Sequence, residues 1–254
     1  MNIYQFAKSQ LDYIYSGNIV KYHKNKLILE DPEKRIAIKI LPIKHSHEPA
    51  LQLLVHSEFI VPITEYKQIH PWQIIYTPYA ELGDLTVFGS IQYQRRVPIK
   101  QCKYIFKQMC YAIKHCRSYF IIHCDIKPEN WFVYETGVKL GDFGLSCFDH
   151  QTKPGFKGTW PYSSPEMFDN IDYDCKIDIW GLGHCLYYMY YGSKAFNYPK
   201  SEIRAQFNLG PNLNIYTINN KKIYTVASLK RLFRRLFQLN PEKRPSIKQV
   251  LQSS

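Results

Sequence analysis

Two short stretches of the chain place carboxylate, amide and lysine side chains close together. The first reads Ile-Ile-His-Cys-Asp-Ile-Lys-Pro-Glu-Asn over residues 121–130, and the second reads Gly-Asp-Phe-Gly over residues 141–144. Transfer of a phosphoryl group needs such residues, because the protein must position the acceptor hydroxyl and neutralise charge on the phosphate oxygens. The residue types therefore predict a phosphoryl-transfer site.

Each of these side chains has a chemical role in that prediction. Asp125 can accept the hydrogen bond, and eventually the proton, of the acceptor hydroxyl, while Lys127 can place a cation at the transferred phosphate. Asn130 and Asp142 supply hard oxygen atoms, and Mg²⁺ prefers a few such ligands together with phosphate oxygens and water. We therefore predict Asn130 and Asp142 as metal ligands. Gly144 permits a tight turn after Asp142.

The order and spacing of these motifs resemble those of the eukaryotic-type protein kinases. An ordinary hairpin with polar turns is the simpler alternative, but His-x-Asp-x-Lys-Pro-Glu-Asn followed by Gly-Asp-Phe-Gly-Leu is a long ordered match. The Lys-Pro-Glu-Asn spelling is similar to the serine/threonine branch. The resemblance covers about residues 36–251 and implies one kinase domain over 1–254 with a two-lobed α+β fold. A small antiparallel sheet lobe with a short helix extends to about residue 80, and a larger, mainly helical lobe covers 81–254.

Residues 35–40 have the pattern of a strand and contain a lysine. In the family, the lysine at the position of Lys39 contacts the α- and β-phosphates of the nucleotide. Its carboxylate partner stays open between Glu48 and Glu58. Only nine residues separate Lys39 from Glu48, so the helix that carries Glu48 must be short, and Pro49 suits its first turn.

The resemblance also implies an ATP site between the lobes, with an altered phosphate-covering loop. The family has three glycines upstream of the lysine, whereas this chain has only Gly17, which also suits the tip of a β-hairpin. Residues 72–79 have the pattern of a buried strand that leads into the linker between the lobes. Thr77 is the expected gatekeeper, and Pro78 offers its carbonyl to the adenine amine. The predicted nucleotide-binding residues are Gly17, Ile19, Ala37, Lys39, Glu48, Thr77, Pro78, Ala80, Asp84 and Asp142.

The resemblance assigns supporting roles to residues of the large lobe. Thr159 orients Asp125 and Lys127 through its hydroxyl, and Asp178 anchors the backbone of the catalytic loop, which follows a helix at about 103–119. Glu166 pairs with Arg244, because a bidentate carboxylate–guanidinium pair has fixed geometry and suits a tie between distant segments. Cys124 replaces the arginine that often binds an activating phosphate, which predicts activity without that phosphate.

Composition indicates a compact enzyme of the cell interior. The chain has 254 residues of which 45% are hydrophobic, enough for a sizeable core. It contains no continuous apolar stretch of the kind that a signal peptide or membrane span needs, so we expect an intracellular protein, cytoplasmic or nuclear, without a membrane partner. The seven cysteines include no Cys-x-x-Cys pair, which predicts reduced thiols.

The net charge of +12 admits a nucleic-acid partner. The cations concerned are Lys221, Lys222, Lys230, Arg231, Arg234 and Arg235. However, apolar residues recur at helical spacing over 229–237, so the last four cations are more simply the solvated face of an amphipathic helix. No nucleic-acid-binding motif supports the alternative.

These features together predict an ATP- and Mg²⁺-dependent serine/threonine protein kinase. The short length, the glycine-poor loop and the missing regulatory tails resemble kinases of large DNA viruses, most nearly the baculovirus late protein kinases. That resemblance implies work in the host nucleus and a basic substrate such as a DNA-condensing protein. Glu129 and Asp84 stand where basophilic members contact arginines near the acceptor, while Tyr188 replaces a third such position. The alternative is a pseudokinase, a binding scaffold that has lost catalysis. The glycine-poor loop and the open choice between Glu48 and Glu58 as the partner of Lys39 support it.

Overall fold

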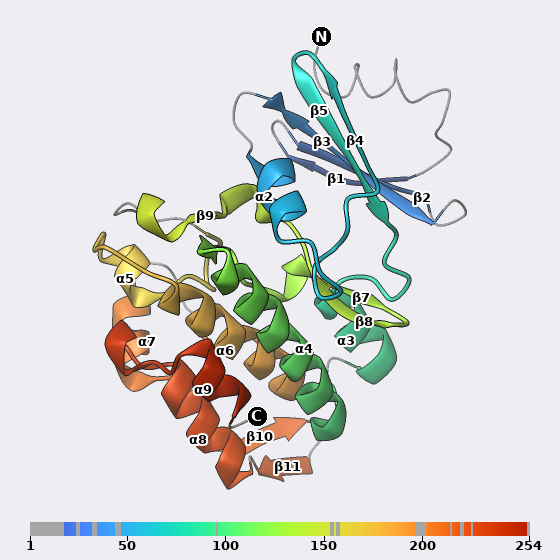
Figure 1. Ribbon diagram of the computed structural model, residues 1–254. Helices are drawn as coiled ribbons and strands as arrows, with labels where there is room; N and C mark the ends of the chain where they lie inside the picture. The colour runs from blue at the N-terminus through green and yellow to red at the C-terminus, as the bar shows by residue number, and fades with distance from the viewer. Residues whose placement is uncertain are drawn as a thin grey trace.

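Two lobes of different construction make up the molecule, a β-sheet above and a bundle of helices below (Figure 1). The structure is a computed structural model. It describes residues 18–23, 26–31, 35–43, 47–94, 96–152, 155, 158–196, 202–213, 215–218, 221–224 and 226–252. This division confirms the predicted two-lobed α+β fold.

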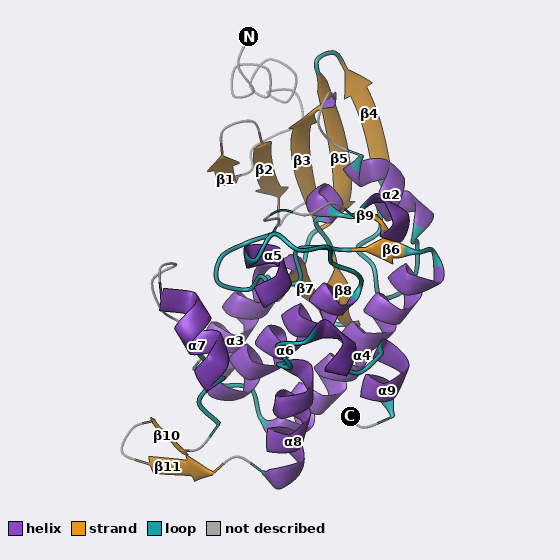
Figure 2. Ribbon diagram, turned by 90° about the vertical axis from the view of Figure 1, so that its left-hand side faces the viewer, coloured by secondary structure: helices purple, strands orange, loops and turns teal. Residues whose placement is uncertain are grey.

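The sheet of the small lobe has five antiparallel strands in the order β1-β2-β3-β5-β4, which Figure 2 shows edge to edge. The central strands β3 and β5 bury β-branched residues, among them Ile38, Ile40 and Ile74, which suit a pleated sheet. The strands predicted at 35–40 and 72–79 are confirmed as β3 and β5. The bounds are β1 Asn18–His23, β2 Lys26–Asp31, β3 Ile36–Pro42, β4 Glu65–Ile69 and β5 Trp72–Pro78.

The first described hairpin joins β1 and β2. β1 pairs with β2 from Asn18 opposite Glu30 to His23 opposite Lys26, so the chain reverses between His23 and Lys26. Ile19, which pairs with Leu29, belongs to a run of good strand formers in β1. Gly17 lies outside the described residues, so its interpretation as a hairpin tip stays a prediction.

A short helix, α2 (Glu48–Leu54), lies beside the sheet and faces the large lobe (Figure 1). Pro49 occupies its first turn, where the missing N–H breaks no helical hydrogen bond. Glu48, Pro49, Leu51 and Gln52 are buried. The prediction that this helix must be short is confirmed.

Long helices form the core of the large lobe. α4 buries one face against α6, and α6 is buried on nearly all sides, as expected of a helix that is apolar around its whole circumference. The helix predicted at 103–119 is confirmed as α4. The bounds are α3 Leu85–Tyr93, α4 Ile99–Ser118, α5 Pro165–Phe168, α6 Lys176–Tyr191, α7 Ile203–Leu209, α8 Ala227–Leu236 and α9 Ile247–Leu251.

Short strand pairs carry the chemical motifs to the boundary between the lobes. Residues 123–130 connect β6 (Ile121–Ile122) to β7 (Trp131–Tyr134), and residues 141–146 connect β8 (Gly137–Leu140) to β9 (Cys147–Phe148). β6 pairs with β9 and β7 pairs with β8, so both connections run between the same two strand pairs. A further hairpin, β10 (Ile215–Ile218) with β11 (Lys221–Tyr224), lies at the far end of the large lobe (Figure 2).

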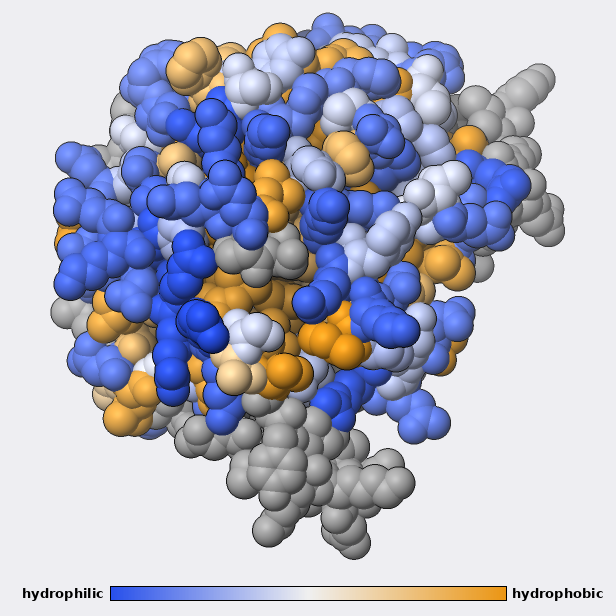
Figure 3. All heavy atoms as spheres, turned by 60° about the horizontal axis from the view of Figure 1, so that its bottom comes forward, coloured by the Kyte–Doolittle hydropathy of each residue, from blue (hydrophilic) through white to orange (hydrophobic). Residues whose placement is uncertain are grey.

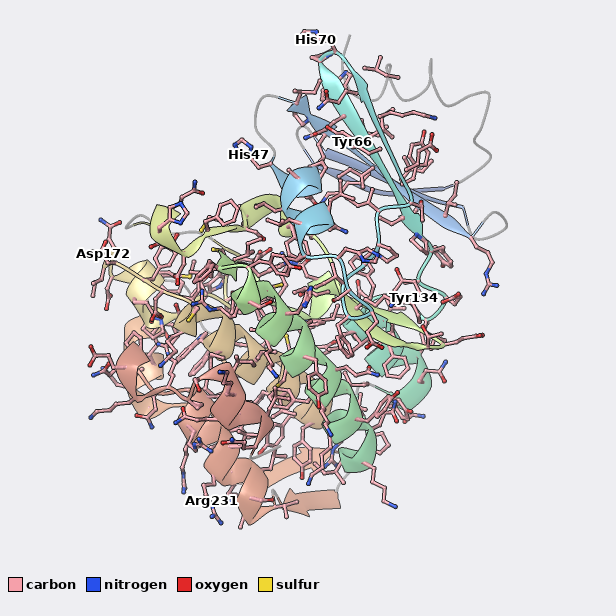
Figure 4. The ribbon with its side chains drawn as sticks, in the orientation of Figure 1. His47, Tyr66, His70, Tyr134, Asp172 and Arg231 are labelled. Carbon is pink, nitrogen blue, oxygen red and sulfur yellow. The ribbon has the colours of Figure 1, made fainter. Side chains whose placement is uncertain are left out.

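Helix α8 has the amphipathic character that its sequence predicts. Leu229, Leu232 and Phe233 are buried, whereas Arg231 and Arg234 are exposed, and Arg231 points away from the lobe in Figure 4. Arg231 and Arg234 therefore lie on a solvated face, while Lys230 and Arg235 are half-buried. On the face drawn in Figure 3, hydrophilic side chains likewise surround an apolar hollow. None of the helices in the described part of the chain is both long and apolar enough to cross a membrane.

Candidate active site

Lys39, Glu48 and Asp142 meet between the two lobes. The Lys39 ammonium lies 2.7 Å from Asp142 Oδ1 and also contacts Glu48 Oε1. Burial alone would lower the pKa of Lys39, but the two carboxylates outweigh burial and hold that pKa above its usual value. The lysine is therefore a fixed cation that connects β3, α2 and the residue before the 3₁₀ turn Phe143–Leu145.

The structure answers which carboxylate pairs with Lys39. Glu48 is buried at the start of α2 and contacts the ammonium directly. Glu58 offers its main-chain carbonyl to Lys139 instead. Space beside the two carboxylates that contact Lys39 is tight. A Cβ on Gly144 would lie 3.2 Å from Asp142 Oδ1 and 3.3 Å from Glu48 Oε2. Glycine at position 144 thus lets the turn pass close to both carboxylates.

The side chains of the catalytic loop converge on Asp125. The Lys127 ammonium lies 2.6 Å from Asp125 Oδ2 and 2.6 Å from Thr159 Oγ1. The Asn130 amide nitrogen donates to Asp125 O at 2.8 Å and to Asp125 Oδ2 at 3.2 Å. This orientation leaves the Asn130 side-chain oxygen as an acceptor, the atom that a hard metal ion would use.

One carboxylate oxygen of Asp125 takes no part in these hydrogen bonds. Asp125 is 8% exposed, and its Oδ1 is buried without a hydrogen-bond partner among the residues that the structure describes. A buried carboxylate oxygen without a donor is costly, so it gains when a hydroxyl donates to it. Asp125 is thus placed to receive an acceptor hydroxyl.

Next to Lys39, Glu48 and Asp142, a cavity of about 230 Å³ opens between the lobes. Apolar side chains make up much of its wall, which suits a flat purine base. Of the predicted nucleotide-binding residues, Gly17 lies outside the described residues and Ile19 is described only as part of β1. The others all line the cavity: Ala37, Lys39, Glu48, Thr77, Pro78, Ala80, Asp84 and Asp142.

Two aromatic residues of this cavity were missed by the sequence analysis. Phe132 and Tyr134 line it from β7, where residues two apart share one face of the strand. The Tyr134 hydroxyl donates to the carbonyl of Pro78 at 3.1 Å, and Tyr134 lies near the boundary of the lobes in Figure 4. The Ala80 N–H has no partner in the described part of the chain. The linker thus presents the Ala80 N–H to the cavity as a donor. It also presents the Pro78 carbonyl as an acceptor that is shared with the Tyr134 hydroxyl.

Comparisons with known proteins agree with this geometry. A family model described as "Protein kinase domain" matches residues 23–254. The chain belongs to this family.

Three relatives share part of this chain. It is 37% identical over 159 residues to sperm motility kinase 2A of Mus musculus, and this match covers 59% of this chain and 30% of that protein. It is 34% identical over 159 residues to sperm motility kinase 2B of the same species, covering 59% and 31%. It is 33% identical over 173 residues to a probable serine/threonine-protein kinase of Dictyostelium discoideum, covering 67% and 10%. The chain thus matches less than a third of the length of each relative.

The catalytic loop of this kinase domain is anchored from below by α6. Asp178 Oδ2 accepts the N–H of His123 at 2.9 Å, and Oδ1 accepts the N–H of Cys124 at 3.0 Å. Burial raises the pKa of Asp178 to about 7, although both N–H groups oppose the rise. Gly181 lets α6 approach, because a Cβ there would lie 2.6 Å from the carbonyl of Ile126. The backbone next to Asp125 is therefore held by the core of the large lobe.

Glu166 and Arg244 form the predicted bidentate pair, with nitrogen–oxygen distances of 2.5 and 2.7 Å. Arg244 also stacks over the ring of Trp180, with its guanidinium carbon 5.0 Å from the ring centre. The pair ties helix α5 to the segment after α8.

The residues predicted to recognise a basic substrate have further contacts. Glu129 Oε1 accepts the hydroxyl of Tyr162 at 3.2 Å, while its Oε2 is buried without a hydrogen-bond partner among the described residues. Asp84 caps helix α3 by accepting the N–H groups of Thr86 and Val87 at 2.8 and 3.0 Å, a structural role that the sequence analysis missed. Tyr188 lies on α6 and is half-buried.

Proposed function

We propose that this chain is an ATP-dependent serine/threonine protein kinase, which transfers the γ-phosphoryl group of ATP to hydroxyls of a protein substrate. The observation that carries the proposal is the partnerless Oδ1 of Asp125, held beside Lys127 and Thr159. The name of the Dictyostelium relative, a probable serine/threonine-protein kinase, supports the same class of acceptor only by analogy.

The chain's own residues divide the work of this reaction. Asp125 orients the acceptor hydroxyl and takes its proton, and Lys127 stabilises the negative charge of the transferred group. Thr159 keeps the Lys127 ammonium in place through their 2.6 Å contact. Lys39, held by Glu48 and Asp142, lies at the inner wall of the cavity and orients the nucleotide phosphates.

The donor set near Asp125 fits Mg²⁺. The described residues contain no group of three or more His, Cys, Asp or Glu side chains that could enclose a metal ion. Asn130 and Asp142 together offer an amide oxygen and a carboxylate, and Mg²⁺ is commonly bound by one or two such ligands plus phosphate oxygens. We therefore propose that Asn130 and Asp142 hold Mg²⁺ with the nucleotide, where the ion neutralises charge on the phosphates.

A basic protein is the proposed substrate. Glu129 keeps one carboxylate oxygen without a hydrogen-bond partner among the described residues, and a guanidinium group satisfies such an oxygen well. Helix α3, which Asp84 caps, packs against the turn that contains Glu129. The relationship to kinases of large DNA viruses, the DNA-condensing substrate and the intracellular location stay predictions from the sequence.

A pseudokinase scaffold is the second candidate function. The hydroxyl of Tyr134 at the Pro78 carbonyl favours it, because adenine would have to share that carbonyl. The scaffold needs the cavity but not Asp125, so one substitution distinguishes the two functions.

The test is incorporation of radiolabelled phosphate from ATP into a basic, serine-rich peptide. Wild type is compared with Asp125→Asn, with and without Mg²⁺, using bacterially expressed protein whose mass shows no phosphate. We expect Mg²⁺-dependent incorporation by wild type and a loss of at least ~100-fold in Asp125→Asn, since general-base catalysis contributes about that much. Asp172→Asn is the matched control, because Asp172 is exposed and lies at the edge of the large lobe in Figure 4.

Each other outcome has a distinct meaning. Equal incorporation by wild type and Asp125→Asn would falsify the role of Asp125. ATP binding without incorporation by either protein would favour the scaffold. Activity that arises only after phosphorylation of Ser146, Thr152 or Thr159 would contradict the prediction drawn from Cys124.

A further inference from the structure

Two thiols touch each other next to the catalytic loop. The sulfur atoms of Cys124 and Cys147 are 3.7 Å apart. Cys124 directly precedes Asp125, and Cys147 begins strand β9, shortly after the turn that contains Asp142. Both side chains are buried, at 5% and 9% exposure. The pair therefore spans the two segments that carry the proposed base and a proposed metal ligand.

The backbone on either side holds these thiols together. Strand pairing sets Ile122 opposite Cys147, two residues before Cys124. Cys124 has a left-handed backbone, with φ of 66°, an uncommon conformation for a residue with a side chain. Its N–H is fixed by Asp178, and the hydroxyl of Ser146 donates to the carbonyl of His123 at 3.1 Å. The contact between the sulfur atoms is thus built into the packing of the loop against β9.

We propose that Cys124 and Cys147 form a disulfide when the protein meets a small peroxide, and that this bond switches the site off. The disulfide itself does not depend on the proposed kinase activity, whereas the loss of turnover does. The pair is buried but not sealed in, because Cys124 also lines a cavity of about 10 Å³ with Asp125, Thr159 and Ser163. That volume is close to the space of one water molecule, so a small oxidant is the class that fits.

The reaction balances with hydrogen peroxide as the oxidant. The sulfur of one cysteine attacks a peroxide oxygen, the O–O bond breaks, and a sulfenic acid and one water form. The second sulfur then attacks the sulfenic sulfur, the S–O bond breaks, and the S–S bond forms as a second water leaves. The two thiols lose two electrons and two protons in total, and the peroxide is reduced to two waters.

Closing this bond must move the site. A disulfide has a sulfur–sulfur distance of about 2.05 Å, so the atoms have to approach by about 1.7 Å from their present 3.7 Å. The thiol form already has Lys127 in contact with both Asp125 and Thr159. A displacement of about 1 Å at a catalytic group costs about 100-fold in rate, so oxidation should lower the turnover number. Neither cysteine lines the cavity next to Lys39, so the KM for ATP should change much less.

Cys175 is the competing thiol. It is partly exposed and packs against the cluster that contains Cys124 and Cys147. Of the other cysteines, Cys102, Cys110 and Cys116 lie on α4 and Cys185 lies on α6, all buried. A decisive experiment must therefore tell a Cys124–Cys147 link from one that uses Cys175.

Peptide mapping makes this distinction directly. Trypsin cleaves after Arg117, Lys139 and Lys157 and so puts Cys124, Cys147 and Cys175 into three separate peptides. Protein treated with hydrogen peroxide is alkylated and digested without reductant, and the peptides are weighed. We expect peptide 118–139 joined to peptide 140–157, with a mass lower by two hydrogen atoms than their sum and with the link lost on reduction. The link should be absent in Cys147→Ser and Cys147→Ala and retained in Cys175→Ser.

Activity is measured on the same samples. Wild type should lose at least ten-fold in turnover number after peroxide and regain it with dithiothreitol, while both Cys147 variants stay active after the same treatment. Absence of the link, a link through Cys175, or oxidation of Cys124 to sulfinic acid alone would overturn the proposal. If the kinase activity itself is lacking, the peptide map still tests the thiol pair, so the two failures are distinguishable.

Discussion

Among single residues, Tyr134 changes the nucleotide cavity most. It is buried, and burial raises the pKa of its hydroxyl above the ordinary range, so the group stays a donor at neutral pH. It donates to the Pro78 carbonyl, the acceptor that an adenine amine also needs. A carbonyl has two lone pairs, so both donors can bind, but each weakens the geometry available to the other.

Removing this hydroxyl should tighten ATP binding. In Tyr134→Phe the Pro78 carbonyl is left for adenine alone, and one hydrogen bond of this kind has a net value of about 0.5–1.5 kcal/mol. We expect the KM for ATP to fall about two- to ten-fold with little change in the turnover number, as measured by initial rates against ATP concentration. Tyr66→Phe is the control, since the Tyr66 hydroxyl bonds to Gln73 on the sheet, away from the cavity. An unchanged or higher KM in Tyr134→Phe would contradict the role given to this contact.

Chemistry made some site residues predictable and left others hidden. The types and spacing of Asp125, Lys127 and Asn130 follow from what phosphoryl transfer needs, and the structure brings them together. The contact of Tyr134 with Pro78 joins residues 56 apart, and no local pattern encodes such a pair. The alternation of residues on β7 was the available signal, because it sets Phe132 and Tyr134 on one face.

For the secondary-structure elements, the coupling between α6 and the catalytic loop matters most. Two neighbouring N–H groups of the loop share the single carboxylate of Asp178, which is 1% exposed. Its pKa is raised to about 7 by burial, from the ordinary value of 3.8. The backbone of the catalytic loop is thus held by the Asp178 carboxyl group, whose protonation changes near neutral pH.

This raised pKa predicts a specific dependence of stability on pH. Between pH 3.8 and 7 the folded protein binds a proton at Asp178 that the unfolded chain has released. The free energy of unfolding therefore decreases as pH rises through this window, by up to about 1.36 kcal/mol per pH unit for this group. Asp178→Asn lacks that contribution. The difference in unfolding free energy, wild type minus variant, should shrink from pH 4.5 to 7 and level off above 7.5 in urea titrations. A difference for Asp178→Asn that grew with pH would refute the assignment.

Elements with strong periodicity were predictable, while a turn without a fixed residue was not. The apolar positions of α4 and α8 recur at helical spacing over more than two turns, which leaves little freedom in where the buried face lies. The reversal between β1 and β2, after His23 and before Lys26, was not predicted, because the residues of both strands are good strand formers and mark no clear boundary.

Across the whole molecule, the buried pair of Glu166 and Arg244 connects segments far apart in the chain. Arg244 is 2% exposed, and its nitrogen atoms also donate to the carbonyls of Gln238 at 2.7 Å and Lys176 at 3.2 Å. These bonds join helix α5, the start of α6 and the segment after α8. One guanidinium group thus connects three segments of the large lobe.

Breaking this pair from one side should therefore destabilise the entire large lobe. Arg244→Met leaves the buried Glu166 carboxylate without its cation, and loss of one partner of a buried ion pair costs about 3–5 kcal/mol. Glu166→Gln leaves the guanidinium unpaired in the same way, and the double variant removes both charges. We expect each single variant to lower the free energy of unfolding in urea by about that amount. The double variant should then be more stable, by at least ~1 kcal/mol, than the sum of the two single losses implies, because residues in direct contact are not additive. Strict additivity would mean that each side chain acts through its other contacts and that the pair is not the tie between these segments.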